Sequence, residues 1–363
     1  MQHSNPNLST TSSRRPFAFR FGLLWIASLV CCIVCAAASA AQPPPKSMVK
    51  ACNKGDFESC YYAGLNQSAR NPAESRRYHA LACNGGYRKG CKELHEATNE
   101  LMQGNSADQS AAVAHFETAC AQDYGRSCTA LATALSKGTG VATDPARALT
   151  LWQKGCEHGS RIGCRRVGTA FEKGELLTKD LGRALAFFQR SCDAGLESAC
   201  ADTGRLLQAG VEPKSTDGGS GETGAAAAAA PLHKACLEAS LDKVRGDACL
   251  RLGRLLAAGD GVPQDPVLAF KAFHMGCRDK QREACVEAGH AALAGRGVEQ
   301  DDNRALGFYG TACQLRSAAG CEALCRLQCN DGQQPYACDR LRTKKWPMFA
   351  SCAMPKAMAG SSR

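Results

Sequence analysis

The chain has 363 residues, a formal net charge of +10 and 23 cysteines. Its length suits several ordinary domains or one elongated array. The modest charge, without interleaved basic and aromatic residues, argues against a dedicated nucleic-acid-binding protein. Few aromatic residues and abundant alanine and glycine favour small, closely packed helices. Cysteine at this density indicates either disulfides in an oxidising compartment or several metal sites.

The N-terminus favours the oxidising compartment. Residues 1–20 carry three arginines and no acid, Phe21–Cys35 is almost wholly apolar, and small residues follow at 38–40. The pattern predicts a signal peptide over residues 1–40 and a periplasmic or extracellular protein. A retained anchor helix is the alternative, for which the apolar run is barely long enough. A twin-arginine signal at 13–17 ranks second, because that route exports folded protein and these disulfides would form after export.

Twenty cysteines remain after cleavage, and most of them come in evenly spaced pairs. A Pro-rich leader covers residues 41–51, and seven of the eight pairs that follow are eight residues apart. A period near 36 predicts stacked repeats in two blocks, 52–210 and 231–328. The pairs are Cys52 with Cys60, Cys83 with Cys91, Cys120 with Cys128, Cys156 with Cys164, Cys192 with Cys200, Cys236 with Cys249, Cys277 with Cys285 and Cys313 with Cys321.

Each repeat begins with a helix of about twelve residues that ends near the first cysteine of a pair. Asp or Asn stands twelve positions before that cysteine and predicts an N-cap, often followed by Pro. An alanine eight positions before and a ring four positions before share one helical face. The predicted caps are Asn71, Asp108, Asp144, Asp180, Asp265 and Asp301. The ring positions are His79, Phe116, Trp152, Phe188, Phe273 and Tyr309.

A second helix begins near the second cysteine. In one continuous helix, cysteines eight apart would be about 12 Å from each other, whereas a disulfide needs Cα atoms within about 7 Å. The chain must therefore reverse, and each disulfide would join two antiparallel helices and contribute roughly 2.5 kcal/mol. Four residues after the second cysteine a recurring glycine predicts close helix–helix approach. These glycines are Gly64, Gly168, Gly204, Gly253 and Gly289, and Gly-x-Gly-Val turns end several of the helices.

Two segments depart from the period. Residues 211–230 are rich in Gly and Ser and end in six alanines, which predicts a flexible insertion whose alanines extend the next helix. Residues 329–363 form a cysteine-containing cap and tail. There the preferred pairings are Cys329 with Cys338 and Cys325 with Cys352. A zinc or iron–sulfur site is the alternative, weakened because the chain is expected to be exported and no Cys-x2-Cys spacing occurs among these last cysteines.

The unit resembles the Sel1-like repeat, and its Cys-x7-Cys version resembles the Helicobacter cysteine-rich proteins. The resemblance covers about Cys52 to Cys321 and rests on the cysteine pairs, the Gly-x-Gly-Val turns and the alanine and ring columns. It implies an all-α solenoid of α/α-hairpins, similar to tetratricopeptide repeats, with one disulfide per repeat and a right-handed superhelix. It also implies binding of proteins or peptides on a concave face, and for the cysteine-rich branch penicillin binding with weak β-lactamase activity.

The leading functional prediction is therefore an exported scaffold that binds protein, peptide or cell-wall fragments, with no cofactor and no metal. Arg147, Arg183 and Arg304 share a position near the start of the first helix and are the candidate binding residues, although a solvated face near the caps is the simpler interpretation. A β-lactam hydrolase is the alternative. It would need a Ser-x-x-Lys motif, and the two matches, at 47–50 and 240–243, are what chance provides. No catalytic residue is therefore assigned.

Overall fold

The structure is a computed structural model that describes residues 43–212 and 224–330. Both described ranges are built from helices, without a strand. The chain divides into two compact units, Met1–Glu93 and Leu94–Arg363. Of the described helices, none combines the length and the apolar character needed to cross a bilayer. The predicted signal peptide lies outside the described residues.

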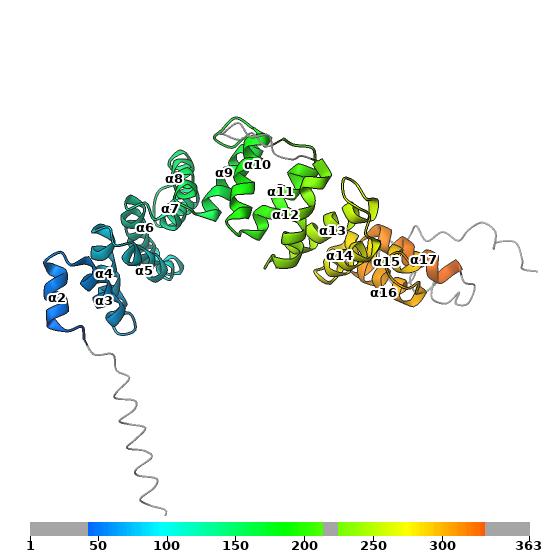
Figure 1. The fold of residues 1–363 in the computed structure, drawn as a ribbon. Coiled ribbons are helices and arrows are strands. Elements are labelled where there is room, and N and C mark those ends of the chain that lie inside the picture. The colour runs from blue at the N-terminus through cyan, green and yellow to red at the C-terminus, as the bar shows by residue number, and fades with distance from the viewer. Residues whose placement is uncertain (1–42, 213–223, 331–363) are drawn as a thin grey trace, which may run out of the picture. The chain divides into compact units, whose positions relative to one another are not determined.

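Sixteen α-helices and one short 3-10 helix follow one another along the described parts of the chain (Figure 1). They are α2 (Lys46–Asn53), α3 (Phe57–Gln67), α4 (Pro72–Asn84), α5 (Arg88–Asn99), η1 (Leu101–Gln103), α6 (Ser106–Ala121), α7 (Gly125–Lys137), α8 (Pro145–Glu157), α9 (Arg161–Lys173), α10 (Leu181–Asp193), α11 (Glu197–Gln208), α12 (Gly224–Glu238), α13 (Asp242–Ala258), α14 (Pro266–Arg278), α15 (Arg282–Ala294), α16 (Asp302–Gln314) and α17 (Ala318–Asn330).

The described helices form eight hairpins, and each hairpin is closed by one disulfide that joins the end of a first helix to the start of a second helix. The Cα–Cα distances across these bonds lie between 4.4 Å and 4.7 Å, within the range that a disulfide requires. The bonded pairs are Cys52 with Cys60, Cys83 with Cys91, Cys120 with Cys128, Cys156 with Cys164, Cys192 with Cys200, Cys236 with Cys249, Cys277 with Cys285 and Cys313 with Cys321.

These eight bonds are the pairs that the spacing of the cysteines predicts. The last four cysteines are a different case. Cys325 is disulfide-bonded, but the predicted pairing of Cys325 with Cys352 and that of Cys329 with Cys338 involve cysteines outside the described residues, and both stay predictions.

The reversal inside each Cys-x7-Cys segment depends on one backbone position. The third residue after the first cysteine has a positive φ in all seven segments with the regular spacing. Glycine adopts this left-handed conformation at little cost, whereas other residues are strained by it. Four segments use glycine, at Gly55, Gly86, Gly159 and Gly195, and three place Asp123, Lys280 or Arg316 there.

The recurring glycine of the second helix receives the ring of the next first helix. A Cβ atom on Gly168 would lie 2.8 Å from the ring of Phe188, and one on Gly253 would lie 2.5 Å from the ring of Phe273. Gly64 stands against His79 in the same way, at 2.5 Å. These rings are almost wholly buried, so this ring-on-glycine contact is the repeated joint between neighbouring hairpins. The predicted close approach of the two helices is confirmed. Glycine is needed in the second helix because the ring of the next first helix packs directly against it.

Most of the predicted caps are confirmed, and one is wrong. The side chains of Asn71, Asp144, Asp180, Asp265 and Asp301 each accept the backbone N–H three residues on, at 2.8 to 3.1 Å. Asp108 is not a cap, because α6 begins earlier and is capped by Asn105. Asp108 instead accepts the backbone N–H of Asn105 in a capping box,.

The irregular hairpin keeps the packing columns of the others. The alanine run lies within α12, as predicted, and supplies the buried Ala228 at the alanine position. Leu232 takes the ring position and packs against Gly204. The wide spacing of Cys236 and Cys249 arises mainly because α13 begins about one helical turn earlier relative to its cysteine than the other second helices do,.

Candidate functional site

A groove between the first helices of the last two hairpins, α14 and α16, is the candidate binding site. Its volume is about 630 Å³, within the range of ligand-binding pockets. His274, Arg278 and Lys280 line it from α14 and the turn that follows, and Arg304, Phe308 and Thr311 line it from α16. The groove therefore combines basic, aromatic and hydroxyl side chains.

His274 and Phe308 line this groove, and the buried ring of Phe270 contacts both of them and Arg304. Phe270 is buried and stacks on His274, with ring centroids 6.3 Å apart. Phe308 meets both rings edge-on, at 6.1 Å and 5.6 Å. The guanidinium carbon of Arg304 lies 5.1 Å from the centroid of the Phe270 ring, a cation–π distance. These contacts restrict the arginine to the edge of the groove.

The basic groups of the groove are not neutralised by the protein. Within residues 43–212 and 224–330, Arg278, Lys280 and Arg304 form no ion pair. Burial lowers the pKa of His274, and the charges of Arg304 and Arg278 lower it further. At neutral pH the imidazole is therefore uncharged, so that one ring nitrogen can donate a hydrogen bond and the other can accept one. The groove keeps three uncompensated positive charges beside apolar side chains.

The three predicted binding arginines have different environments. Arg147 is paired with Glu117, with Nη2 and Oε1 2.9 Å apart. Arg183 lies over the ring of Phe171 at 5.6 Å and is 3.8 Å from the cap carboxylate of its own helix. Arg304 alone of the three lines the α14–α16 groove. Their common role in binding stays a prediction.

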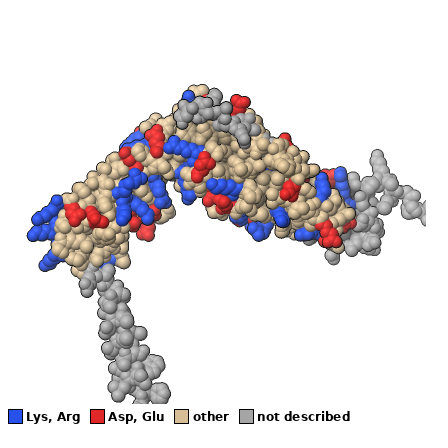
Figure 2. All heavy atoms as spheres, viewed as in Figure 1, with Lys and Arg blue, Asp and Glu red and all other residues tan. Residues whose placement is uncertain are grey.

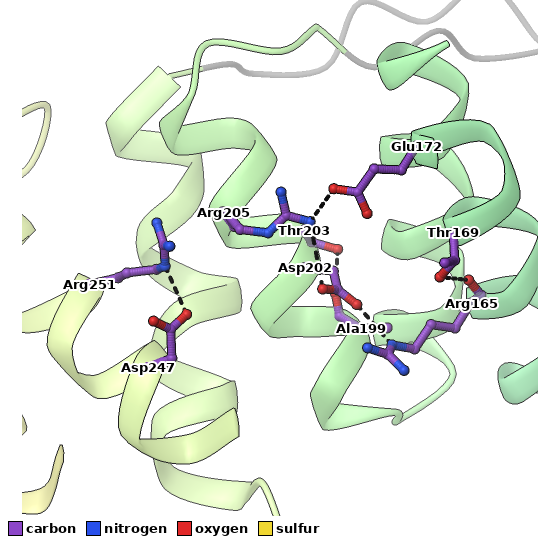
Figure 3. Close-up of polar contacts among 9 residues, drawn as sticks. All are labelled: Arg165, Thr169, Glu172, Ala199, Asp202, Thr203, Arg205, Asp247 and Arg251. Carbon is purple, nitrogen blue, oxygen red and sulfur yellow. Dashed lines mark hydrogen bonds and ion pairs between the residues drawn. The ribbon is translucent and has the colours of Figure 1, made fainter. Parts of the chain in front are cut away.

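On the second helices, arginines are engaged in pairs between hairpins (Figure 3). Arg165 Nε donates to Asp202 Oδ2 at 2.8 Å, and Arg205 Nη2 donates to Glu172 Oε1 at 2.6 Å, so that α9 and α11 are tied twice. Burial raises the pKa of Asp202, and the guanidinium of Arg165 opposes this shift. These charges stabilise the stack of hairpins rather than remaining available to a ligand. On the face seen in Figure 2, basic and acidic groups are correspondingly intermingled.

The serines proposed for a hydrolase are not built into a site. Ser47 and Lys50 are exposed on α2. Ser240 is exposed in the loop between α12 and α13, and Lys243 is exposed at the start of α13. Neither serine lines the α14–α16 groove. The hydrolase alternative therefore gains no support from the position of its residues.

One serine–histidine pair does occur, inside the core. His95 Nδ1 lies 3.0 Å from Ser127 Oγ, but His95 is 6% exposed and Ser127 is fully buried. Burial lowers the pKa of His95 to about 4. A nucleophile has to reach its substrate, so the pair is a packed structural contact. Among the described residues, no group of His, Cys, Asp and Glu side chains is arranged to hold a metal ion.

The repeat signature has a direct match. A family model described as the Sel1 repeat matches residues 48–87, 100–124, 125–160, 162–196, 246–278 and 282–317, more than half of the chain. The chain belongs to the Sel1 repeat family. The predicted membership and the predicted all-α hairpin solenoid are thereby confirmed, and a comparison with curated proteins finds no match.

Several solved structures are similar to this chain at low sequence identity. A protective antigen of uropathogenic Escherichia coli, described as displaying an SLR fold, is 21% identical with a TM-score of 0.58, covering 87% of this chain and 68% of its own. A Sel1 repeat protein from Oxalobacter formigenes is 20% identical (TM-score 0.49; 62% and 83% covered). Helicobacter pylori cysteine rich protein B is 23% identical (TM-score 0.31; 37% and 95% covered). The first of these likenesses shows the fold alone.

The sequence prediction missed most of the groove. His274, Arg278, Lys280 and Phe308 were not candidates, because no motif marks them. The available signal was positional. The signal lies at two positions of each regular hairpin, three residues before and three residues after its first cysteine. Only the hairpin of α14 and α15 has His at the first of these positions and Lys at the second.

Proposed function

We propose that this Sel1 repeat protein is an exported scaffold that binds a protein or peptide ligand along the exposed faces of its first helices. The α14–α16 groove carries the proposal, because it is open, large enough for a ligand and lined by polar groups around aromatic rings. Solenoid proteins use such extended surfaces for binding. Cell-wall fragments are the second ligand class to test.

Export is supported by the disulfides and by the N-terminal sequence pattern. Eight hairpins are each closed by a buried disulfide, and such bonds persist in oxidising compartments. Fractionation of cells that express the full chain tests this. The mature protein should be found outside the cytoplasm without residues 1–40, and free-thiol counting should find none. A reduced protein in the cytoplasm would contradict export.

Site-specific photo-crosslinking tests the binding surface. A crosslinking amino acid at Gln314, exposed in the α14–α16 groove, should capture a discrete protein ligand in native extract. The matched control is Ala258, exposed at the end of the second helix α13. Equal capture at both positions, or no capture at positions along the first helices, would refute the proposed surface.

A further inference from the structure

We propose that the α14–α16 groove recognises an acidic, extended segment of a partner protein. Arg278, Lys280 and Arg304 would bind its carboxylates, and Phe308 would contact its apolar side chains. The inference rests on the proposed function and specifies the chemistry of the ligand. It is carried by a comparison with the corresponding first helices α6 and α8, where the basic groups of α8 are paired with acids of the chain itself.

Between the first helices α6 and α8, acids of the chain neutralise the facing basic groups. Arg147 Nη2 lies 2.9 Å from Glu117 Oε1, and Lys154 Nζ lies 2.9 Å from Asp123 Oδ1. Glu117 stands three residues before the first cysteine of its hairpin, and Asp123 stands three residues after it. Each carboxylate faces a basic group of the next first helix. No charge is left there for an acidic ligand.

The α14–α16 groove keeps the arginine of the next helix and loses both acids. At the position of Glu117 stands His274, and at the position of Asp123 stands Lys280. Arg304 occupies the same helix position as Arg147, but no carboxylate pairs with it among the described residues. A neutral ring and a cation thus stand where Glu117 and Asp123 balance the basic groups of α8.

Arg278 and the cap residue of α16 complete this picture. Arg278 directly follows the first cysteine and adds a third cation to the groove lining. Two acids precede Arg304 closely in the sequence, Asp301 and Asp302, and with Glu299 they line a neighbouring hollow beside it. Asp301 accepts the backbone N–H of Arg304 at 3.0 Å as the helix cap, and among the described residues none of the three forms an ion pair with the guanidinium. Charge-assisted hydrogen bonds donated to a ligand carboxylate would satisfy these groups.

The charge of the chain itself argues against its own C-terminal segment as the occupant. Residues 331–363 contain two acidic and six basic residues, so that segment would be repelled by the groove. An acidic segment of a different protein is complementary to it. Phe308 and Leu315, which line the groove, favour a peptide with interspersed apolar side chains over a ligand that offers only phosphates.

Binding of a defined probe tests the inference on the mature chain. The probe is a short fluorescein-labelled peptide of alternating glutamate and phenylalanine, followed by fluorescence anisotropy, and its twin has glutamine for glutamate. We expect salt-sensitive binding of the acidic probe alone. Lys280→Gln with Arg304→Gln should weaken it at least about tenfold, which corresponds to about 1.4 kcal/mol. Arg126→Gln is the matched control and should leave binding unchanged, because Arg126 is an exposed arginine of the second helix α7 that pairs with Glu96 at 3.0 Å.

The chain also offers a gain-of-function test. Glu117→His with Asp123→Lys removes both acids that pair with α8 and frees Arg147, so the probe should then bind at a second site. That site should be the weaker one, because Val113 stands at the position of Phe270. Lysine is compatible with the backbone at position 123, since Asp123 has φ 59° and Lys280 has φ 63°.

Three results would overturn the inference. The glutamine twin could bind as tightly as the acidic probe, the Lys280/Arg304 variant could bind the probe as tightly as the unchanged protein, or the protein could bind phosphatidylglycerol vesicles and not the peptide. If the probe fails while Gln314 still crosslinks to a protein, the scaffold function stands and only the acidic ligand is wrong. If crosslinking at the first helices also fails, the proposed function is wrong as well.

Discussion

Replacing Gly253 by alanine should show that the joints between hairpins have no spare room. The new Cβ would lie 2.5 Å from Cε1 and 2.6 Å from Cδ1 of Phe273, whose ring is 5% exposed and cannot move aside freely. Overpacking of this kind costs about 1–3 kcal/mol, while alanine in a helix interior gains about 1 kcal/mol over glycine. We therefore expect Gly253→Ala to lower the free energy of unfolding by up to about 2 kcal/mol.

A matched glycine separates these two contributions. Gly310 lies within α16, and a Cβ there would meet nothing within 4 Å, so Gly310→Ala should raise the free energy of unfolding by up to about 1 kcal/mol. Urea unfolding followed by far-ultraviolet circular dichroism compares the two variants. In a Phe273→Ala background, Gly253→Ala should become stabilising. If Gly253→Ala stabilises the otherwise unchanged protein as much as Gly310→Ala does, the ring does not occupy the joint.

Three further predictions concern a buried histidine, a strained turn and a disulfide. Burial lowers the pKa of His79 to about 4. Between about pH 6.5 and 4 only the unfolded chain binds a proton at this histidine, so the free energy of unfolding should fall by up to about 1.4 kcal/mol for each pH unit of acidification. Urea unfolding at pH 7.5 and at pH 5 should therefore show a smaller loss of stability for His79→Phe than for the unchanged protein. Leu176 is exposed with φ 62°, so Leu176→Gly should raise the melting temperature by relieving about 1 kcal/mol of strain; a lower value would contradict this. Replacing Cys156 and Cys164 by alanine should cost about 2.5 kcal/mol in the same urea assay, and an unchanged midpoint would show that the disulfide does not constrain the unfolded chain.

The hairpins were predictable from the sequence because their determinants are local. A Cys-x7-Cys segment cannot close a disulfide within one helix, and a ring and a small residue at helical spacing share one face. The misplaced cap shows where local reasoning fails. Asn105 and Asp108 are both competent caps, and the structure uses both in one capping box. Counting twelve residues back from the cysteine selects Asp108, but α6 begins earlier than the first helices of the other hairpins, so its cap is Asn105.

The groove could not be predicted in the same way, because its character depends on partners from another helix. The arginine positions are visible in the sequence, but whether an arginine is available is decided about 30 residues away. Glu117 neutralises Arg147 from the preceding hairpin, whereas His274 leaves Arg304 uncompensated. Sequence periodicity identifies the position on the helix, and only the packing of neighbouring hairpins identifies the facing group.

The two helix pairs, α6 with α8 and α14 with α16, also explain how a repeat array can vary in binding without loss of its fold. The alanine, glycine and cysteine positions of the described hairpins are buried in the joints, as are the rings other than the partly buried Trp152. Glu117 and Asp123, by contrast, belong to pairs that are largely exposed. Exposed ion pairs contribute at most about 1 kcal/mol each. The exchange Glu117→His with Asp123→Lys should therefore change the urea midpoint little while it creates a new acidic-ligand site. A large loss of stability would mean that these pairs hold the hairpins together, and that ligand chemistry and fold are not separable in this protein.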